Sequence, residues 1–190
     1  ISKLKKELND ERFENSQENR EISMAEFNTL KVSDLLFSYE KNDSEAHFSV
    51  GPLNFSLEKG EAVFIYGGNG SGKTTLINAI LGILQSNSGS IRFNEAELTA
   101  TNYSEYRTLF SVVFSDFHLF GEVYGIDNVS ESEIIYYLEL FELTGKVSFK
   151  NNSFSSNSLS TGQRKRLAFI DALIRNNPII VLDEWAADQD

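Results

Sequence analysis

Residues 28–58 alternate between apolar and polar side chains, which is the pattern of strands that bury one face. The alternation is clean over 47–50 and 53–57 and only partial in the run before them. Turn-forming residues at 42–44 and at 51–52 separate these runs, so we expect strands joined by turns. The apolar positions of the first run are Leu30, Val32, Leu35, Phe37 and Tyr39.

Two continuous apolar runs, at 62–66 and 179–182, predict strands that are buried on both faces of a parallel sheet. A glycine-rich segment follows the first run, and a helical pattern follows that segment. Strand, tight loop and helix in this order open an α/β nucleotide-binding core, so the pattern predicts the α/β class. The helical pattern consists of Leu76, Ile77, Ile80, Leu81 and Leu84.

The remaining stretches are less regular. Residues from about 95 to 158 are mixed and contain one predicted helix, at 133–143, while the Asn- and Ser-rich segment 151–158 predicts a loop. A second helical pattern starts near Ser160. Residues 1–20 are charged, and a helix there would be marginal by itself, so we interpret them as a linker.

The strongest chemical signal is a match to the phosphate-binding pattern G-x-x-x-x-G-K-[ST]. Glycines accept positive φ angles and let backbone N–H groups face an anion, and the following helix points its positive end at it. Lys73 can reach the β- and γ-phosphates, the Thr74 hydroxyl can ligate Mg²⁺, and Thr75 follows them in the nucleotide site. The alternative, a flexible glycine turn before a lysine, does not account for the strand and helix patterns on either side. The motif comprises Gly67, Gly68, Asn69, Gly70, Ser71, Gly72, Lys73 and Thr74.

A pair of carboxylates, Asp183 and Glu184, ends the second apolar run. An α/β sheet binds ligands at the carboxyl ends of its strands, so this pair is expected beside the phosphate loop. Asp183 is placed to hold Mg²⁺, and Glu184 is placed to orient or deprotonate an attacking water. Taken alone, the pair would be read as a solvated strand end; the phosphate-loop motif upstream favours the functional interpretation.

The third signal is the segment Leu159, Ser160, Thr161, Gly162 and Gln163, which precedes the second helical pattern. The unsatisfied N–H groups at the start of such a helix can bind an anion. Ser160 and Gln163 also fit the capping box S-x-x-Q, which is a sufficient structural reason for that pair. Both interpretations remain open at this point.

These three motifs, in this order, resemble the ATPase domain of ABC transporters, whose signature L-S-G-G-Q has Thr161 in its third place here. The resemblance covers nearly all of the chain from about residue 28. It implies a P-loop NTPase (RecA-like) parallel core, an N-terminal antiparallel β subdomain and a small helical subdomain at about 95–158. The ATPase domain would span 28–190 and residues 1–27 would be a linker.

The resemblance also implies that the domain works on ATP and Mg²⁺ as one half of a dimer. Residues 159–163 of one copy would cover the γ-phosphate that is held by the other copy. Tyr39 stands where the family stacks an aromatic ring on adenine; the alternative is a strand residue that faces the core. Residues 187–190 fall where the family's D-loop begins.

Further segments are similar to the exporters of cyclic peptides and peptide siderophores. These segments are Tyr106 with Arg107, residues 109–120, 159–167 and 183–190. The resemblance implies ATP-driven export at the cytoplasmic face of the bacterial inner membrane, with a transmembrane domain as partner. Residues 1–27 would then be the stub that leaves the last membrane helix.

Two departures from the family pattern affect these expectations. Ser115 stands where the family places a glutamine that contacts Mg²⁺ and couples the site to the membrane domain; neighbouring Asp116 could substitute. The chain also stops at Asp190, before the strand with the family's switch histidine, which neither His47 nor His118 matches. We therefore expect a fragment, or a protein that has lost its C-terminal part, which binds nucleotide weakly and hydrolyses it little in isolation.

The charge balance limits the partners. The chain has 17 basic and 28 acidic side chains, a net charge of -11, and no cysteine. Broad binding to nucleic acid needs clustered Lys and Arg, so a non-transport ABC ATPase that acts on DNA or ribosomes is disfavoured. A nucleotide-gated interaction module stays open as an alternative, because the chain stops early although Glu184 is present.

Overall fold

The computed structural model describes residues 27–39, 48–115, 130–156 and 158–185. The chain divides into two compact units. The first unit comprises Ile1–Phe64 and Ser86–Tyr103, and the second comprises Ile65–Gln85 and Ser104–Asp190.

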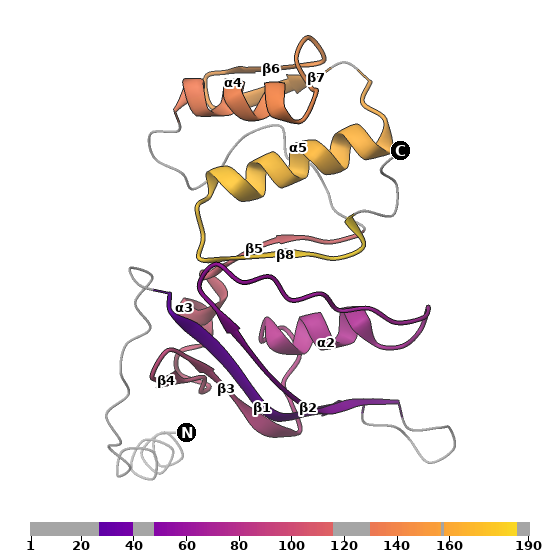
Figure 1. Ribbon diagram of the computed structural model, residues 1–190, viewed down its shortest axis with the longest axis vertical. Helices are drawn as coiled ribbons and strands as arrows, with labels where there is room; N and C mark the ends of the chain where they lie inside the picture. Colours follow the sequence, from indigo (N-terminus) through magenta and orange to yellow (C-terminus); the bar gives the residue numbers. More distant parts are fainter. Residues whose placement is uncertain (1–26, 40–47, 116–129, 157, 186–190) are drawn as a thin grey trace, which may run out of the picture. The chain divides into compact units, whose positions relative to one another are not determined.

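An antiparallel sheet organises the first unit (Figure 1). Its strands are β1 (Thr29–Ser38), β2 (Ser49–Glu58), β3 (Ser88–Phe93) and β4 (Ala96–Glu97), in the order β2-β1-β3-β4. This arrangement confirms the strand character predicted for 28–58 and the antiparallel β subdomain, whereas the sequence pattern did not predict β3 and β4. The buried side chains of this unit are Phe27, Leu30, Val32, Leu35, Phe37, Ile91, Phe93 and Ala96.

An irregularity in β1 explains why its alternation is only partial in the sequence. The register of β1 against β2 shifts between Val32 and Leu35, and Asp34 has a left-handed backbone, with φ 47°. Asn54 stabilises this bend, because its side chain accepts from the Asp34 N–H and donates to the Asp34 carboxylate, both at 2.8 Å. The extra residue returns Leu35 to the buried face that Val32 occupies.

The predicted turn at Gly51 and Pro52 is wrong, because both residues lie inside β2. Gly51 has a φ of +111°, and a Cβ atom on it would lie 2.1 Å from the carbonyl oxygen of Leu35. Glycine is therefore required here because β1 and β2 approach each other closely. The proline is tolerated because β2 is an outer strand of this sheet, where one side needs no ladder hydrogen bonds. The other predicted turn, at 42–44, falls outside the described residues.

A parallel pair of strands, β5 (Phe110–Val113) and β8 (Ile179–Leu182), organises the second unit. The run 179–182 thus forms the predicted parallel strand, but Ile180 and Leu182 are exposed, so it is not buried on both faces. Figure 1 shows helix α5 (Thr161–Ile174) beside this pair and helix α4 (Glu131–Leu140) beyond α5. Helix α2 (Lys73–Ile80) also belongs to this unit, and α3 (Tyr103–Arg107) begins at the unit boundary. The parallel pair, the antiparallel sheet and the helices confirm the predicted α/β class. The core between α4 and α5 consists of Ile134, Leu138, Leu143, Val147, Leu167, Ile170 and Ile174.

The apolar run 62–66 does not form the strand that its sequence predicts. Phe64 is 84% exposed and Tyr66 is 92% exposed, in contrast to a strand that is buried on both faces. The chain passes from the first unit to the second within this run. A buried parallel strand needs hydrogen-bonded neighbours on both sides, and an apolar run specifies the side chains of such a strand but not its partners.

The segment between α4 and α5 contains a hairpin where the sequence predicts only a loop. Strands β6 (Val147–Lys150) and β7 (Ser153–Ser156) pair antiparallel across Asn151 and Asn152. These two asparagines have φ of 52° and 56°, as a two-residue type I′ turn requires. The predicted helix at 133–143 exists but runs from Glu131 to Leu140, and Ser130 caps it. The predicted subdomain range 95–158 also includes β5, which pairs with β8.

The carboxyl end of α2 is fixed by two side chains of α3. The hydroxyl of Tyr106, which is fully buried, donates to the Ile80 carbonyl at 2.7 Å. Arg107 donates through Nη2 to the Gly82 carbonyl at 2.5 Å. The last carbonyls of a helix have no partner within it, so these bonds satisfy groups that would otherwise lie buried without one.

Replacing Tyr106 by Phe should lower the free energy of unfolding by about 1–3 kcal/mol, because the buried Ile80 carbonyl loses its donor. Urea unfolding followed by circular dichroism measures this change. Tyr136→Phe is the matched control, since Tyr136 is 57% exposed and its variant should stay within about 0.5 kcal/mol of the wild type. Equal midpoints for the two variants would contradict the role given to the Tyr106 hydroxyl.

Candidate nucleotide-binding site

The phosphate-loop motif forms a glycine-dependent turn before α2. Gly70 and Gly72 have φ of 76° and 92°, which side-chain-bearing residues rarely adopt. A Cβ atom on Gly67 would lie 2.6 Å from the Ser71 hydroxyl oxygen. Within the turn, the Ser71 N–H donates to the Gly68 carbonyl at 3.2 Å. Gly70 and Gly72 therefore have a conformational reason for being glycine, and a side chain at 67 would displace the Ser71 hydroxyl.

Lys73 is the first residue of α2, and its side chain folds back over this turn. Its Nζ donates to the carbonyls of Gly67 and Gly68, at 3.1 Å each. The residue before it, Gly72, is the N-cap of α2 and offers no side chain to the first amides of the helix. The turn thus combines a lysine Nζ with the amino end of a helix, which favours an anion. Asn69 is exposed on the same turn and Thr75 is half-buried in α2.

A side-chain hydrogen bond joins the phosphate loop to the end of β8. The Thr74 hydroxyl donates to Oδ2 of Asp183 at 3.0 Å, across 109 residues of sequence. Asp183 is 3% exposed, and its backbone N–H donates to the Val113 carbonyl at 2.9 Å, which continues the parallel ladder. The structure therefore brings together the first two motifs found in the sequence.

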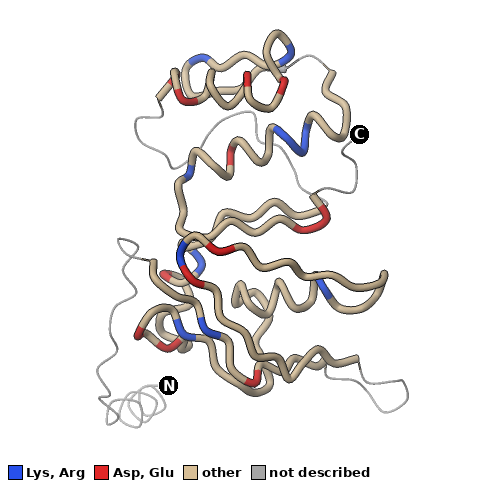
Figure 2. Tube along the Cα trace, viewed as in Figure 1, with Lys and Arg blue, Asp and Glu red and all other residues tan. Residues whose placement is uncertain are grey.

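Glu184 follows Asp183 in the left-handed region, with φ 52°. That conformation costs a residue with a Cβ atom roughly 1–2 kcal/mol, so the surroundings must hold it. The Glu184 side chain is exposed, whereas that of Asp183 is buried. Figure 2 shows acidic positions at this end of β8. Ser115, two residues after β5, is exposed at the same edge of the parallel pair.

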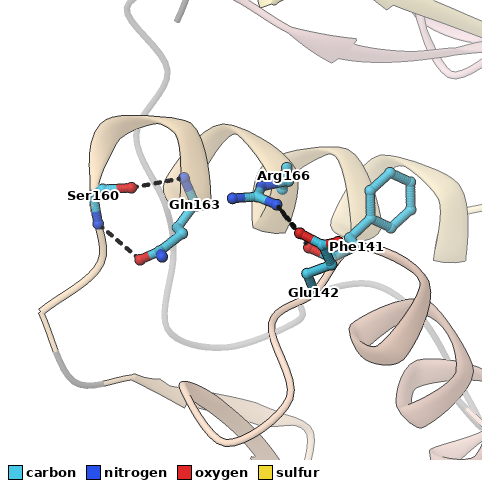
Figure 3. A network of polar contacts seen from close by, with 5 residues as sticks. All are labelled: Phe141, Glu142, Ser160, Gln163 and Arg166. Atoms are coloured by element: carbon cyan, nitrogen blue, oxygen red, sulfur yellow. Dashed lines mark hydrogen bonds and ion pairs between the residues drawn. The ribbon is translucent and has the colours of Figure 1, made fainter. Parts of the chain in front are cut away.

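The third motif caps helix α5. The Ser160 hydroxyl oxygen accepts from the Gln163 N–H at 3.3 Å, and the Gln163 side chain accepts from the Ser160 N–H at 3.1 Å (Figure 3). The capping box predicted from the sequence is therefore present. Ser160 and Thr161 are exposed, Gly162 is half-buried, and Leu159 packs against the core between α4 and α5. Ser160 and Thr161 remain exposed although the cap is formed. The structure is therefore compatible with Ser160 as a helix cap and with Ser160 as part of an anion-binding helix start.

Arg166 connects α5 to the end of α4, a contact that sequence reasoning missed. Its Nη1 donates to the Phe141 carbonyl at 3.2 Å and lies 3.5 Å from a carboxylate oxygen of Glu142 (Figure 3). Sequence reasoning likewise assigned no structural role to Lys165 or Trp185. Nothing in the helical pattern distinguishes the buried Lys165 from its exposed neighbour Arg164, because both are basic residues in the same turn.

Tyr39 belongs to the first unit and lies directly after β1. It is 47% exposed, so it does not face the core, and its ring meets Phe37 edge to face at 4.9 Å. Its contact with adenine stays a prediction. Asp116, His47, His118 and the predicted D-loop at 187–190 lie outside the described residues.

Within the residues that the structure describes, no three His, Cys, Asp or Glu side chains gather closely enough to hold a metal by themselves. Over the same residues, none of the helices has the length and apolar character needed to cross a membrane.

Replacing Ser160 by Ala should lower the free energy of unfolding by about 0.5–2 kcal/mol, because α5 loses the acceptor for its Gln163 amide. Ser160→Asp should retain most of the wild-type stability, since aspartate is an equally good N-cap. Chemical unfolding of the three proteins checks this ranking. If Ser160→Ala lowers the free energy of unfolding no more than Ser160→Asp does, the acceptor at position 160 contributes nothing to stability.

A scan against protein-family models matches residues 50–187 to the family described as ABC transporter. The chain is 38% identical over 166 residues to the ATP-binding protein SyrD of Pseudomonas syringae pv. syringae, covering 85% of this chain and 29% of that protein. It is 31% identical over 168 residues to the ATP-dependent lipid A-core flippase of Haemophilus influenzae, covering 82% of this chain and 28% of that protein. The chain thus spans less than a third of the length of these two relatives.

Solved structures share the fold. A bacterial Atm1-family ABC exporter with ATP bound gives a TM-score of 0.72 at 19% identity, over 92% of this chain and 32% of that one. A dimeric bacterial ABC transporter cassette gives 0.65 at 23% identity, over 85% of this chain and 76% of that one. With its phosphate loop, its Thr74–Asp183 contact and the family match over 50–187, the chain belongs to the ABC transporter family, as an ATP-binding ATPase domain.

Proposed function

We propose that this domain binds ATP together with Mg²⁺, closes on it with a second copy, and hydrolyses it. The observation that carries the proposal is the hydrogen bond between Thr74 and Asp183, because it places two oxygen ligands of different motifs 3.0 Å apart beside the phosphate loop. That spacing suits a site for a hard cation bound to polyphosphate.

ATP would bind through its phosphates at the turn formed by 67–72 and at the amino end of α2. The positive φ angles of Gly70 and Gly72 and the uncapped start of α2 support this assignment, as does the position of Lys73 over the turn. On phosphate binding, Lys73 would exchange the Gly67 and Gly68 carbonyls for phosphate oxygens, which are stronger acceptors because they are charged. Tyr39 would contribute stacking on adenine.

Mg²⁺ would be held by Thr74 and Asp183, with Ser115 as a further oxygen ligand at the same strand edge. Two or three protein oxygens suit this ion, because it keeps several waters and takes phosphate oxygens as its other ligands. When bound, it would neutralise charge on the phosphates. The burial of Asp183 supports this role, since a buried carboxylate needs a cation or hydrogen-bond donors.

Glu184 would orient the attacking water and accept its proton. Its exposed carboxylate follows the Asp183 ligand directly, so the two acidic side chains can act on the ion and on the water separately. Ser160, Thr161 and Gly162 of the second copy would cover the γ-phosphate. The Ser160 hydroxyl uses its oxygen for the cap and retains its own proton for a phosphate oxygen.

We extend the proposal to transport. Closure and reopening of the dimer would move an attached membrane domain at the cytoplasmic face of a bacterial inner membrane. A ligand drives such a change only by its differential affinity for the closed state, and a γ-phosphate shared by two copies supplies this difference. Likeness to proteins named as a flippase and as an exporter supports export in general. The sequence segments similar to cyclic-peptide and siderophore exporters favour a peptide as the substrate.

Replacing Glu184 by Gln should produce a stable dimer at saturating ATP and Mg²⁺, because nucleotide binds but is not hydrolysed. Light scattering during size-exclusion chromatography measures the dimer. The control is the same variant with Lys73→Ala, which should stay monomeric because phosphate binding is lost. If Glu184→Gln is monomeric under these conditions, the dimeric scheme fails.

Replacing Ser160 by Asp in the Glu184→Gln background should abolish that dimer. The aspartate keeps the cap of α5 but places a negative charge where a phosphate of the second copy would approach. Nucleotide binding by the monomer should stay within about twofold of its value before the change, which is under half a kcal/mol. Equilibrium dialysis with ATP measures that affinity, and a dimer that survives would show that Ser160 lies away from the second copy's phosphates.

A further inference from the structure

Lys165 is a buried lysine in the first turns of α5. Lys165 is only 3% exposed, although its neighbour Arg164 is exposed. A buried amino group is costly unless it is hydrogen-bonded. Its Nζ donates to the backbone carbonyl of Glu184 at 3.0 Å, at the residue after Asp183. The lysine therefore ends at the backbone of the acidic pair rather than in solvent.

A second hydrogen bond joins the same two segments in the opposite direction. The indole Nε1 of Trp185 donates to the backbone carbonyl of Lys165 at 3.0 Å. The ring of Trp185 also packs against Phe169, one turn further along α5, with ring centroids 5.2 Å apart. Residues 184 and 185 are thus held to α5 by two reciprocal hydrogen bonds and a ring contact, which we call the α5 clamp.

The α5 clamp acts on the residue whose backbone needs support. Glu184 has a left-handed φ of 52°, which residues with a Cβ atom rarely adopt. Lys165 binds the carbonyl of Glu184, and the indole of Trp185 binds the carbonyl of Lys165. Together these bonds fix the peptide on the carboxyl side of Glu184. The direction of the Glu184 side chain depends on this backbone conformation, because a change of φ rotates the Cβ atom about the N–Cα bond.

We infer that Lys165 and Trp185 are positioning residues that hold the Glu184 backbone in its left-handed conformation and so aim its carboxylate at the attacking water. The inference rests on the proposed function. Because Ser160 is the N-cap of α5, the clamp also ties the glutamate of one ATP site to the helix start proposed to cover the other site. Figure 2 marks basic positions on α5 and acidic positions at the end of β8.

The test compares Lys165→Met, Trp185→Phe and the double variant with wild type. Methionine keeps the apolar length of lysine but cannot donate, and phenylalanine keeps a ring against Phe169 without the N–H. Lys150→Met is the matched control, because it is the same substitution at an exposed position of β6. Steady-state ATP hydrolysis gives kcat and KM, and thermal unfolding gives the midpoint of each protein.

Each single variant should lower kcat at least tenfold, with KM for ATP within twofold and an unfolding midpoint close to that of wild type. The double variant should be no slower than the slower single variant, since both substitutions release the same backbone. Lys150→Met should match wild type. A KM that rises together with the fall in kcat, or a fall in kcat that tracks a lower midpoint, would reduce the clamp to a structural role and overturn the inference.

A second readout is independent of turnover. Trp185 is the only tryptophan in the chain, so its fluorescence reports on this position alone. Acrylamide should quench it more strongly in Lys165→Met than in wild type or Lys150→Met. Equal quenching overturns the inference. If Glu184→Gln forms no dimer with ATP and Mg²⁺, the proposed function fails, whereas the quenching comparison still decides whether Lys165 holds the segment.

Discussion

The hydrogen bond between Thr74 and Asp183 joins two segments that are 109 residues apart, and the site depends on it. Thr74 is placed by the first turn of α2, whose start is set by the left-handed Gly72. Asp183 is placed by β8, whose ladder with β5 continues into its own N–H. The start of α2 and the end of β8 thus meet through two short side chains. The hydroxyl oxygen of Thr74 and a carboxylate oxygen of Asp183 lie side by side where phosphate and Mg²⁺ are expected.

Helix α5 is the element that links the remaining parts of the second unit. Its first turn is closed by the capping box of Ser160 and Gln163, so the segment proposed to cover a phosphate has a defined conformation before any ligand arrives. Arg166 fixes the same helix to the end of α4, and Lys165 fixes it to the residue after Asp183. Two consecutive basic residues thereby bind two different segments to one helix.

Polar residues with left-handed backbones recur where the chain changes direction. Asp34 bends β1 so that Val32 and Leu35 share one buried face, and Asn151 with Asn152 closes the hairpin beside α4. Asp and Asn tolerate this conformation better than other residues with a side chain. Glu184 lacks that tolerance, and the contacts of its own backbone carbonyl and of Trp185 with α5 compensate for it.

The sequence by itself determined the features that depend on local chemistry: the glycine turn at 67–72, the capped start of α5, the strand character of 28–58 and 179–182, and the acidic end of β8. Tertiary structure alone decided which partners these features meet. The apolar run 62–66 carried no information about strand neighbours, and the basic run at 164–166 did not indicate which residue would be buried. Local propensity depends on nearby residues, whereas strand pairing and the burial of Lys165 depend on segments distant in sequence, which a pattern along the chain does not specify.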